Sequence, residues 1–286
     1  MLLKKDICIR DPYIYFENET YYLYASMHFQ GDKYPSFVVY TSKDLENFNE
    51  PKVVFSGYDG FWATKDYWAP EMHKYNDKYY LFVSLKAENK CRATHILVSD
   101  KPDGLFVPNS IDPVTPKDWE SLDGTLYVKN GTPYMIFCHE WLQVDDGEIC
   151  AIELSKDLKE AVGEPKLLFK GSDLKWIKPI VNPNYVTKWN SFVTDGPFLF
   201  ERNNKLNMIW STYSQNGYSV ALSTSDDLLG KWEQYDTPLF DNNGGHGMIF
   251  EQNGRKKLVI HVPNDPNGLE RFEVFDLEDL IQERGL

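Results

Sequence analysis

Short apolar runs alternate with polar turns along the whole chain, and one arrangement of this kind occurs five times. The stretch NETYYLYAS at 18–26 has a near-copy in NDKYYLFVS at 76–84. Each copy has an apolar strand, a turn with Asn, Asp or Gly, and a second strand rich in Tyr, Phe, Ile and Val, which predicts a β-hairpin. The turn asparagines of the five copies are Asn18, Asn76, Asn130, Asn203 and Asn253.

A further strand-like run follows each hairpin, for example FVVYTSKDLENF after the first copy and ICAIELSKDL after the third. Repeats of about 50 to 70 residues, made of antiparallel strands without a helical period, are typical of a β-propeller. A β-sandwich does not need five matching hairpins, and the coils of a β-helix are much shorter. The pattern therefore predicts an all-β protein, a five-bladed β-propeller. No linker-like stretch divides the chain, so we expect residues 1–286 to form one domain.

The repeat also predicts where a site would lie. The first strand of every blade lines the central channel of a propeller, so residues at one repeat position form a ring near the axis. Read down the first column, this ring holds three carboxylates and a histidine, because the positions are Asp11, Ala69, Asp123, Gly196 with Asp195 just before it, and His246. A charge buried at the start of an apolar strand is costly unless it has partners. The alternative is that each Asp caps a turn at the start of a blade.

Neighbouring carboxylates raise one another's pKa, so that one can stay protonated as an acid while another is ionised as a base. A pair of carboxyl groups, one acid and one base, is what glycoside hydrolysis requires. A serine nucleophile has less support, because the chain lacks GxSxG. Metal-dependent hydrolysis has less support too, because one ring histidine without HxH or HExxH is a weak metal signal.

Charge and the first residues narrow the class of partner. The chain has 43 acidic and 30 basic side chains and a net charge of -13, which argues against nucleic acid and anionic membranes as partners. The opening residues MLLKKDICIRDPY contain no apolar export segment, and nowhere do eighteen apolar residues run together. We therefore expect a cytoplasmic protein; a secreted or periplasmic origin stays open if an export segment precedes these residues.

Five motifs resemble glycoside hydrolase family 43 over nearly the whole chain: RDPYI at 10–14, YWAPEMH at 67–73, SLDGTLY at 121–127, TDGPF at 194–198 and GGHGMIF at 244–250. The resemblance implies a five-bladed propeller and an inverting hydrolase of α-L-arabinofuranosides or β-D-xylosides in plant-type polysaccharides or oligosaccharides. We interpret the chain as an α-L-arabinofuranosidase, with a β-xylosidase or galactan-side-chain hydrolase as the alternative. A propeller that binds carbohydrate without cleaving it is the alternative from another class.

The same resemblance assigns roles by matched position. Asp11 resembles the general base that activates water, and Asp123 resembles the carboxylate that tunes the pKa of the acid and helps to orient it. The family commonly has Glu before Gly-Pro in the fourth blade, where this chain has Asp195, which is shorter by one methylene. This departure leaves the general acid open.

Two residues are candidates for that acid. Asp195 lies one step out of register with Asp11, so it needs a bulge at Gly196 to face the axis. Glu140, in the motif CHEW, follows the second strand of blade three, which ends at the same face. The carboxyl groups of an inverting enzyme stand about 6.5–9.5 Å apart, which either candidate could satisfy. We prefer Asp195.

Further candidates for binding the substrate surround the ring. Trp62, Trp68 and Trp141 offer aromatic faces for a sugar ring, although a single Trp is more often part of a core. Arg271 could donate to sugar hydroxyls, or else form a surface salt bridge. His246 resembles a family histidine on the axis that holds a calcium ion through water in some members, or it is a neutral histidine bonded to a core carboxylate. No cofactor is expected to be required, and the calcium would be structural.

Overall fold

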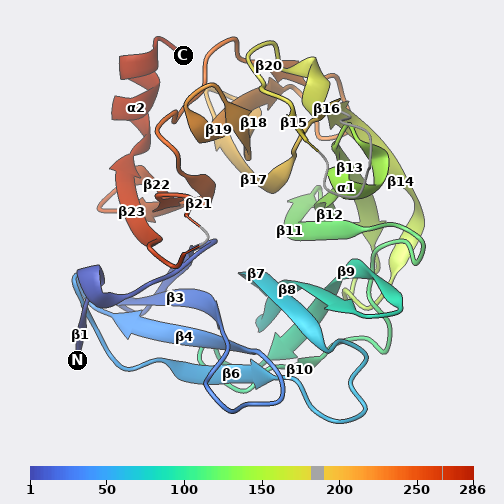
Figure 1. Cartoon of the computed structure of the whole chain (residues 1–286), viewed down its shortest axis with the longest axis vertical. Helices are drawn as coiled ribbons and strands as arrows, with labels where there is room; N and C mark the ends of the chain where they lie inside the picture. Colours follow the sequence, from blue (N-terminus) through green and yellow to red (C-terminus); the bar gives the residue numbers. More distant parts are fainter. Residues whose placement is uncertain (182–189, 266) are drawn as a thin grey trace.

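The computed structural model describes residues 1–181, 190–265 and 267–286. Its strands form five antiparallel sheets arranged as blades around a central axis, with the first strand of each sheet innermost (Figure 1). The predicted fold class, a five-bladed β-propeller, is confirmed.

Four blades have four main strands and the fifth has three. Blade one comprises β2 (Tyr13–Glu17), β3 (Thr20–Met27), β4 (Ser36–Ser42) and β6 (Lys52–Ser56), extended by β5 (Asn47–Phe48) and β1 (Leu2–Leu3). Blade two comprises β7 (Lys65–Tyr75), β8 (Lys78–Ala87), β9 (Lys90–Ser99) and β10 (Val107–Pro108). Blade three comprises β11 (Ser121–Lys129), β12 (Thr132–His139), β13 (Glu148–Leu154) and β14 (Ala161–Lys170). Blade four comprises β17 (Asp195–Arg202), β18 (Lys205–Ser214), β19 (Gly217–Ser225) and β20 (Glu233–Gln234). Blade five comprises β21 (Gly245–Gln252), β22 (Arg255–Val262) and β23 (Arg271–Asp276).

Short elements complete the ring. They are the α-helices α1 (Trp141–Val144) and α2 (Leu277–Arg284), the 3-10 turns at Lys4–Asp6 and Gly171–Asp173, and a two-stranded ribbon of β15 (Ile180–Val181) and β16 (Asn190–Ser191). Among the described residues no helix is long and apolar enough to cross a membrane.

The five predicted hairpins are confirmed, and they share one kind of turn. Each turn asparagine and the residue after it have positive φ, as in Asn130 at 49° and Gly131 at 76°. Two consecutive left-handed residues define the type I′ turn, whose twist matches that of the flanking strands. The local sequence of each turn therefore sets the register of the two innermost strands of its blade.

A second shared feature occurs where each inner strand begins. The five residues of the first column all have left-handed backbone, with φ of 51°, 44°, 57°, 49° and 44° at Asp11, Ala69, Asp123, Gly196 and His246. The residue that follows is Pro or Gly in every blade. In blades two to five, two residues of the inner strand here lie opposite one residue of the second strand. This is a β-bulge, which bends the strand and redirects the side chain at its start.

The ring closes where blade five meets blade one. The Ile9 amide donates to the Glu270 carbonyl at 3.1 Å, and Lys4 Nζ lies 2.9 Å from Glu273 Oε2. Beneath these polar contacts the rings of Phe48 and Phe272 meet edge to face, 5.7 Å apart. The first residues of the chain thus pack against the region of β23, the last strand, at one seam (Figure 1).

The left-handed start of each blade should carry a measurable strain. Ala69 has φ of 44°, whereas Ala93 lies in the regular strand β9, and both side chains are buried. Gly at either site removes the same methyl, but only at Ala69 does it relieve a backbone that costs a non-Gly residue about 1–2 kcal/mol. We expect Ala69→Gly to be more stable than Ala93→Gly by about 1 kcal/mol or more in urea unfolding. Equal losses in the two variants would contradict this account.

Candidate active site

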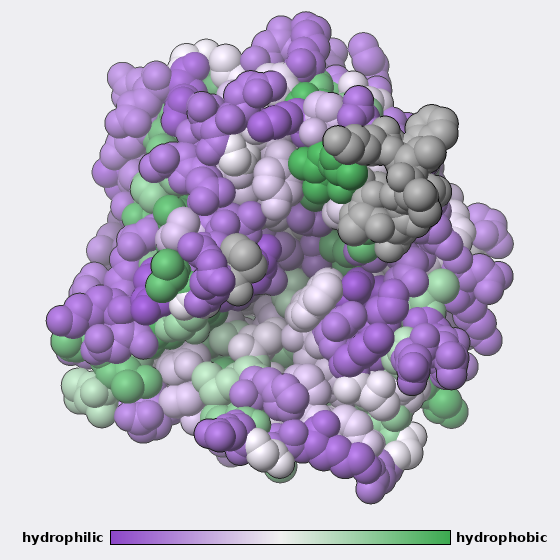
Figure 2. All heavy atoms as spheres, viewed as in Figure 1, coloured by the Kyte–Doolittle hydropathy of each residue, from purple (hydrophilic) through white to green (hydrophobic). Residues whose placement is uncertain are grey.

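Three side chains of the first column meet at the axis. His246 Nδ1 lies 3.2 Å from Asp11 Oδ1 and 3.8 Å from Asp123 Oδ2. The face of the molecule in Figure 2 is largely hydrophilic and is hollowed toward its middle, where the inner strands converge in Figure 1. The structure therefore brings the predicted Asp11, Asp123 and His246 together.

Gly196 makes this convergence possible. A Cβ atom on Gly196 would lie 2.8 Å from Cδ2 of His246, closer than carbon atoms approach without a clash. The histidine of blade five thus occupies the space that the side chain of blade four would fill. The Gly196 amide, freed by the bulge, donates to Asp123 Oδ2 at 2.9 Å.

Asp123 is the most enclosed of the three carboxylates. Its amide donates to Ser84 Oγ at 2.8 Å, and this hydroxyl lies 3.4 Å from Asp123 Oδ1. Burial raises the pKa of Asp123, His246 lowers it and the charge of Asp11 raises it again, with a raised pKa as the result. Only about 3% of Asp123 is exposed, so its carboxylate contacts neighbouring protein groups rather than a bound molecule, and its charge affects their pKa values.

Asp195 reaches the same group from the position before the bulge. The pairing register of β17 shifts between Asp195 and Phe198, as the sequence required. The half-buried carboxyl accepts a hydrogen bond from the Tyr218 hydroxyl at 2.9 Å. Burial, followed by the charge of Asp123, raises the pKa of Asp195 to about 7, against the opposing effects of His246 and Tyr218. A carboxyl with this pKa holds its proton near neutral pH.

His246 supplies the positive charge of the group. Burial lowers the pKa of its imidazole, but Asp11, Asp123 and Asp195 outweigh burial, and the pKa is raised. Its backbone amide donates to Ser211 Oγ at 2.8 Å. Over residues 1–181, 190–265 and 267–286, no three His, Cys, Asp or Glu side chains are arranged to hold a metal ion directly. The donor set does not fit a directly bound cation, and the calcium held through water stays a prediction.

Glu140 and Trp68 are joined by an arginine that the sequence analysis did not consider. Arg92 Nε lies 3.3 Å from Glu140 Oε2, and its NH1 atom lies 3.1 Å from Asp66. The guanidinium stacks 3.8 Å from the centre of the Trp68 ring, which is 42% exposed. Burial raises the pKa of Glu140, while Arg92 opposes that shift. Trp68 has the same repeat position as Asp195, the residue just before the first column.

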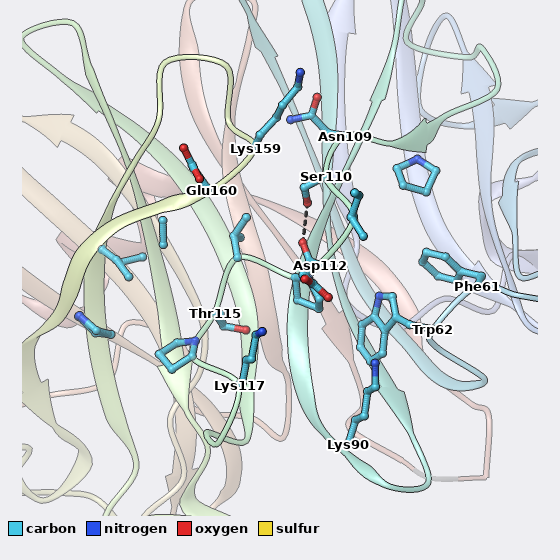
Figure 3. Close-up of a pocket in the computed structure, with 18 of the residues that line it drawn as sticks. Phe61, Trp62, Lys90, Asn109, Ser110, Asp112, Thr115, Lys117, Lys159 and Glu160 are labelled. Carbon is cyan, nitrogen blue, oxygen red and sulfur yellow. Dashed lines mark hydrogen bonds between the residues drawn. The ribbon is translucent and has the colours of Figure 1, made fainter.

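The other two tryptophans differ in position. Trp141 is the first residue of α1 and is partly exposed, next to Glu140. Trp62 lies elsewhere, in a groove of about 1270 Å³ between the outer parts of blades two and three. Figure 3 shows its indole there beside Lys90 and Asp112. Trp62 lies in this groove because its Nε1 atom contacts Nδ1 of His95 on β9 at 3.3 Å. This contact holds the indole against the third strand of blade two.

The structure does not bring Arg271 to the carboxylates. It opens β23, the third strand of its blade, and its guanidinium donates to the backbone carbonyls of Lys5 and Glu270. The arginine at the site is Arg10, whose Nε lies 3.8 Å from Asp11 Oδ1 and whose NH1 lies 3.2 Å from Glu270 Oε1. Two features of the sequence could have identified Arg10. It precedes Asp11 in the motif RDPYI, and it has the same repeat position as Asp195.

Two buried groups at the site were also missed. His261 accepts a hydrogen bond at Nδ1 from the Asp11 amide at 3.3 Å, and burial lowers the pKa of His261 to about 4. Below the ring, Glu71 and Asp11 line a small cavity with His246. Glu71 Oε2 and Asp11 Oδ1 are buried, and the described residues offer them no hydrogen bond. The column alignment could not find His261, because it lies on a second strand, β22.

Comparison with known proteins agrees with this architecture. The sequence model of Glycosyl hydrolases family 43 matches residues 7–273. Xylosidase/arabinosidase 43A of Humicola insolens is 29% identical over 151 residues, which are 48% of this chain and 45% of that protein. Alpha-L-arabinofuranosidase 43 of the same organism is 22% identical over 238 residues, 72% of this chain and 47% of that protein. The chain spans less than half the length of the curated relatives it matches.

A solved structure matches over almost its full length. The endo-arabinase from Bacteroides thetaiotaomicron VPI-5482 is 35% identical, with a TM-score of 0.87 and coverage of 96% of each chain. This likeness extends over all five blades.

The raised pKa of Asp195 predicts a pH-dependent loss of stability. A carboxyl with a higher pKa in the folded protein than in the unfolded one contributes stability that is complete below the unfolded pKa, about 4. That contribution is lost as the pH rises through about 7. The variant Asp195→Asn has no carboxyl to ionise at this position, so it does not lose this stability. The difference in unfolding midpoint, variant minus parent, should therefore be more positive at pH 8 than at pH 5. Asp100→Asn, at a side chain 85% exposed, is the control. A pH-independent difference for Asp195→Asn would show that the carboxyl ionises normally.

Proposed function

Because this chain belongs to glycosyl hydrolases family 43, we propose that it is an inverting glycoside hydrolase that cleaves α-L-arabinofuranosyl linkages in plant-type polysaccharides or oligosaccharides. The observation that carries the proposal is the pairing of a partly exposed Asp11 with a partly exposed Asp195 of raised pKa.

In the proposed reaction, Asp11 removes a proton from a water molecule as that water attacks the anomeric carbon. Asp195 gives its proton to the glycosidic oxygen as the bond from the anomeric carbon to that oxygen breaks. Burial, followed by the charge of Asp123, keeps the pKa of Asp195 high enough for the proton to be present. His246 balances the negative charge of the group, and Arg10, half exposed at the rim, is placed to donate to sugar hydroxyls.

Asp195 is preferred to Glu140 as the acid because of what each carboxyl contacts. Glu140 is about 4% exposed, and although burial raises its pKa, the paired Arg92 opposes that shift and occupies one carboxyl oxygen. Asp195 is more exposed, and it faces three titratable groups of the axial cluster. In this proposal Glu140 holds Arg92 and thereby Trp68, which offers an aromatic face to the substrate.

Support for an arabinosyl substrate comes from the relatives. The solved structure with 35% identity is called an endo-arabinase, and curated relatives are called xylosidase/arabinosidase and alpha-L-arabinofuranosidase. The same names make β-xylosidase activity the alternative. The reaction draws on carboxyl groups alone in this proposal, and a calcium ion held through water near His246 would only support the structure.

A propeller that binds carbohydrate without cleaving it is the competing class. It would not need a partly exposed carboxyl with a pKa near neutrality, whose ionisation costs stability. The three carboxylates, each in a different blade, favour the enzyme.

A substrate panel tests the proposal. We expect turnover of nitrophenyl α-L-arabinofuranoside or linear arabinan, and less of nitrophenyl β-xyloside or galactofuranoside. Asp11→Asn should lose nearly all of this activity, at least about 1000-fold, with little change in unfolding midpoint, because it removes the base but keeps the shape. Binding of arabinan without turnover by the folded parent protein would support the non-catalytic alternative, and substantial turnover by Asp11→Asn would remove Asp11 from its role.

Leaving-group dependence separates the two acid candidates. A general acid matters most when the leaving group is poor, because protonation of the departing oxygen is then the difficult part. Asp195→Ala should therefore lose about 100-fold or more on a natural arabinoside, but much less on a dinitrophenyl arabinoside. Glu140→Ala should impair both substrates alike. The reverse pattern would transfer the role to Glu140.

A further inference from the structure

Among the residues that the structure describes, Tyr218 is the one hydrogen-bond donor to the Asp195 carboxyl, and it comes from an element that the repeat alignment does not place at the axis. It is the second residue of β19, the third strand of blade four. Its hydroxyl lies 2.9 Å from Asp195 Oδ2, and burial, followed by the charges of Asp195, Asp11 and Asp123, raises the pKa of the phenol well above its ordinary value. The phenol is therefore neutral and keeps its proton to donate.

The Tyr218 ring is held by blade five. A Cβ atom on Gly245 would lie 2.7 Å from the ring, so the ring fills the place of a side chain that blade five lacks. On another side it stacks on the imidazole of His261, with centres 5.7 Å apart and planes 17° from parallel. The Tyr218 carbonyl accepts from the Gly244 amide at 2.9 Å. Only 2% of Tyr218 is exposed.

His261 has its protonation set by its hydrogen bonds. The Asp11 amide donates to Nδ1, which must therefore be unprotonated, and the proton is on Nε2, 3.3 Å from Asn264 Oδ1. The side-chain amide of Asn264 in turn donates from Nδ2 to the Tyr213 hydroxyl at 3.2 Å. Asp11 and Asp195 are thus fixed by two stacked aromatic groups, His261 and Tyr218, that contact each other.

We propose that Tyr218 is a positioning residue for the general acid: its hydroxyl occupies Asp195 Oδ2, so that Oδ1 carries the transferable proton. This inference rests on the proposed function for its role in turnover, but not for the hydrogen bond itself. During the reaction Oδ1–H gives its proton to the glycosidic oxygen, and the aspartate that forms keeps the Tyr218 hydrogen bond. A bond to the ionised carboxylate is stronger than one to the acid, so Tyr218 favours proton release.

The charged and titratable groups near Asp195 set the direction of the expected pH effect. They are Asp11, Asp123, His246, Tyr213, Tyr218, Arg10, Glu140 and Cys138. The Tyr218 hydrogen bond lowers the pKa of Asp195 and the charge of Asp123 raises it. Loss of the hydroxyl should therefore move the basic limb of the activity profile to higher pH, and Asp123→Asn should move it to lower pH.

The test compares Tyr218→Phe with Tyr24→Phe. Tyr24 is a buried tyrosine of blade one whose hydroxyl donates to the Pro102 carbonyl at 2.6 Å, so its variant loses a similar bond away from the site. We expect Tyr218→Phe to lower kcat about 10- to 100-fold on a natural arabinoside, as loss of a hydrogen bond to a charged group implies, and far less on a dinitrophenyl arabinoside. KM should change little, and Tyr24→Phe should leave both rates and the basic limb unchanged. Equal losses on both substrates with an unmoved limb would reduce Tyr218 to a packing residue.

An infrared titration makes the result independent of turnover. The protonated-carboxyl band of Asp195, identified by its loss in Asp195→Asn, should titrate at higher pH in Tyr218→Phe than in the parent protein. This shift without hydrolysis of any substrate would uphold the hydrogen bond while the proposed function fails. An unshifted band in an active enzyme would overturn the inference and leave the proposed function standing.

Discussion

The left-handed residue that opens each inner strand is the constraint on which the site depends. In a regular strand successive side chains point to opposite faces of the sheet, so a strand directed at the axis could not aim two neighbouring side chains at it. The bulge at this position releases a backbone amide and turns the strand. Asp123 can therefore accept from the Gly196 amide, while Asp195, one residue earlier, faces the same hollow.

Electrostatics gives each carboxylate a different environment. Asp123 has protein on all sides, Asp11 and Asp195 are partly open, and His246 lies among them. Like charges in a poorly solvated place cannot all ionise at low cost, so the pKa values of Asp123 and Asp195 are raised, and the raised pKa of His246 favours an imidazolium that offsets part of the repulsion. A pseudosymmetric ring thus gives residues of one chemical type different degrees of burial and different proton affinities.

Local features of the sequence predicted much of the fold, and long-range packing accounts for what was missed. The Asn-centred turns act within a few residues, and the column of Asp11, Asp123 and His246 followed from their spacing. The direction of the Arg271 side chain depends on its hydrogen bonds to the backbone carbonyls of Lys5 and Glu270, at the seam with the first residues of the chain. Trp62 is likewise placed by His95 on another strand. The bulge was predicted for blade four alone, although Pro or Gly follows the column residue in every blade.

The seam between blades five and one gives the site a property that a single blade could not have. Asp11 belongs to the first blade and its amide is held by His261 of the last, while the ring beside them is closed by the Ile9 amide on the Glu270 carbonyl. The joint that completes the ring is therefore the joint that orients Asp11. A chain whose first and last blades have separated can retain most of its sheet structure while the Asp11 amide loses its partner, so under the proposed function hydrolytic activity would report closure of the ring rather than folding of its blades.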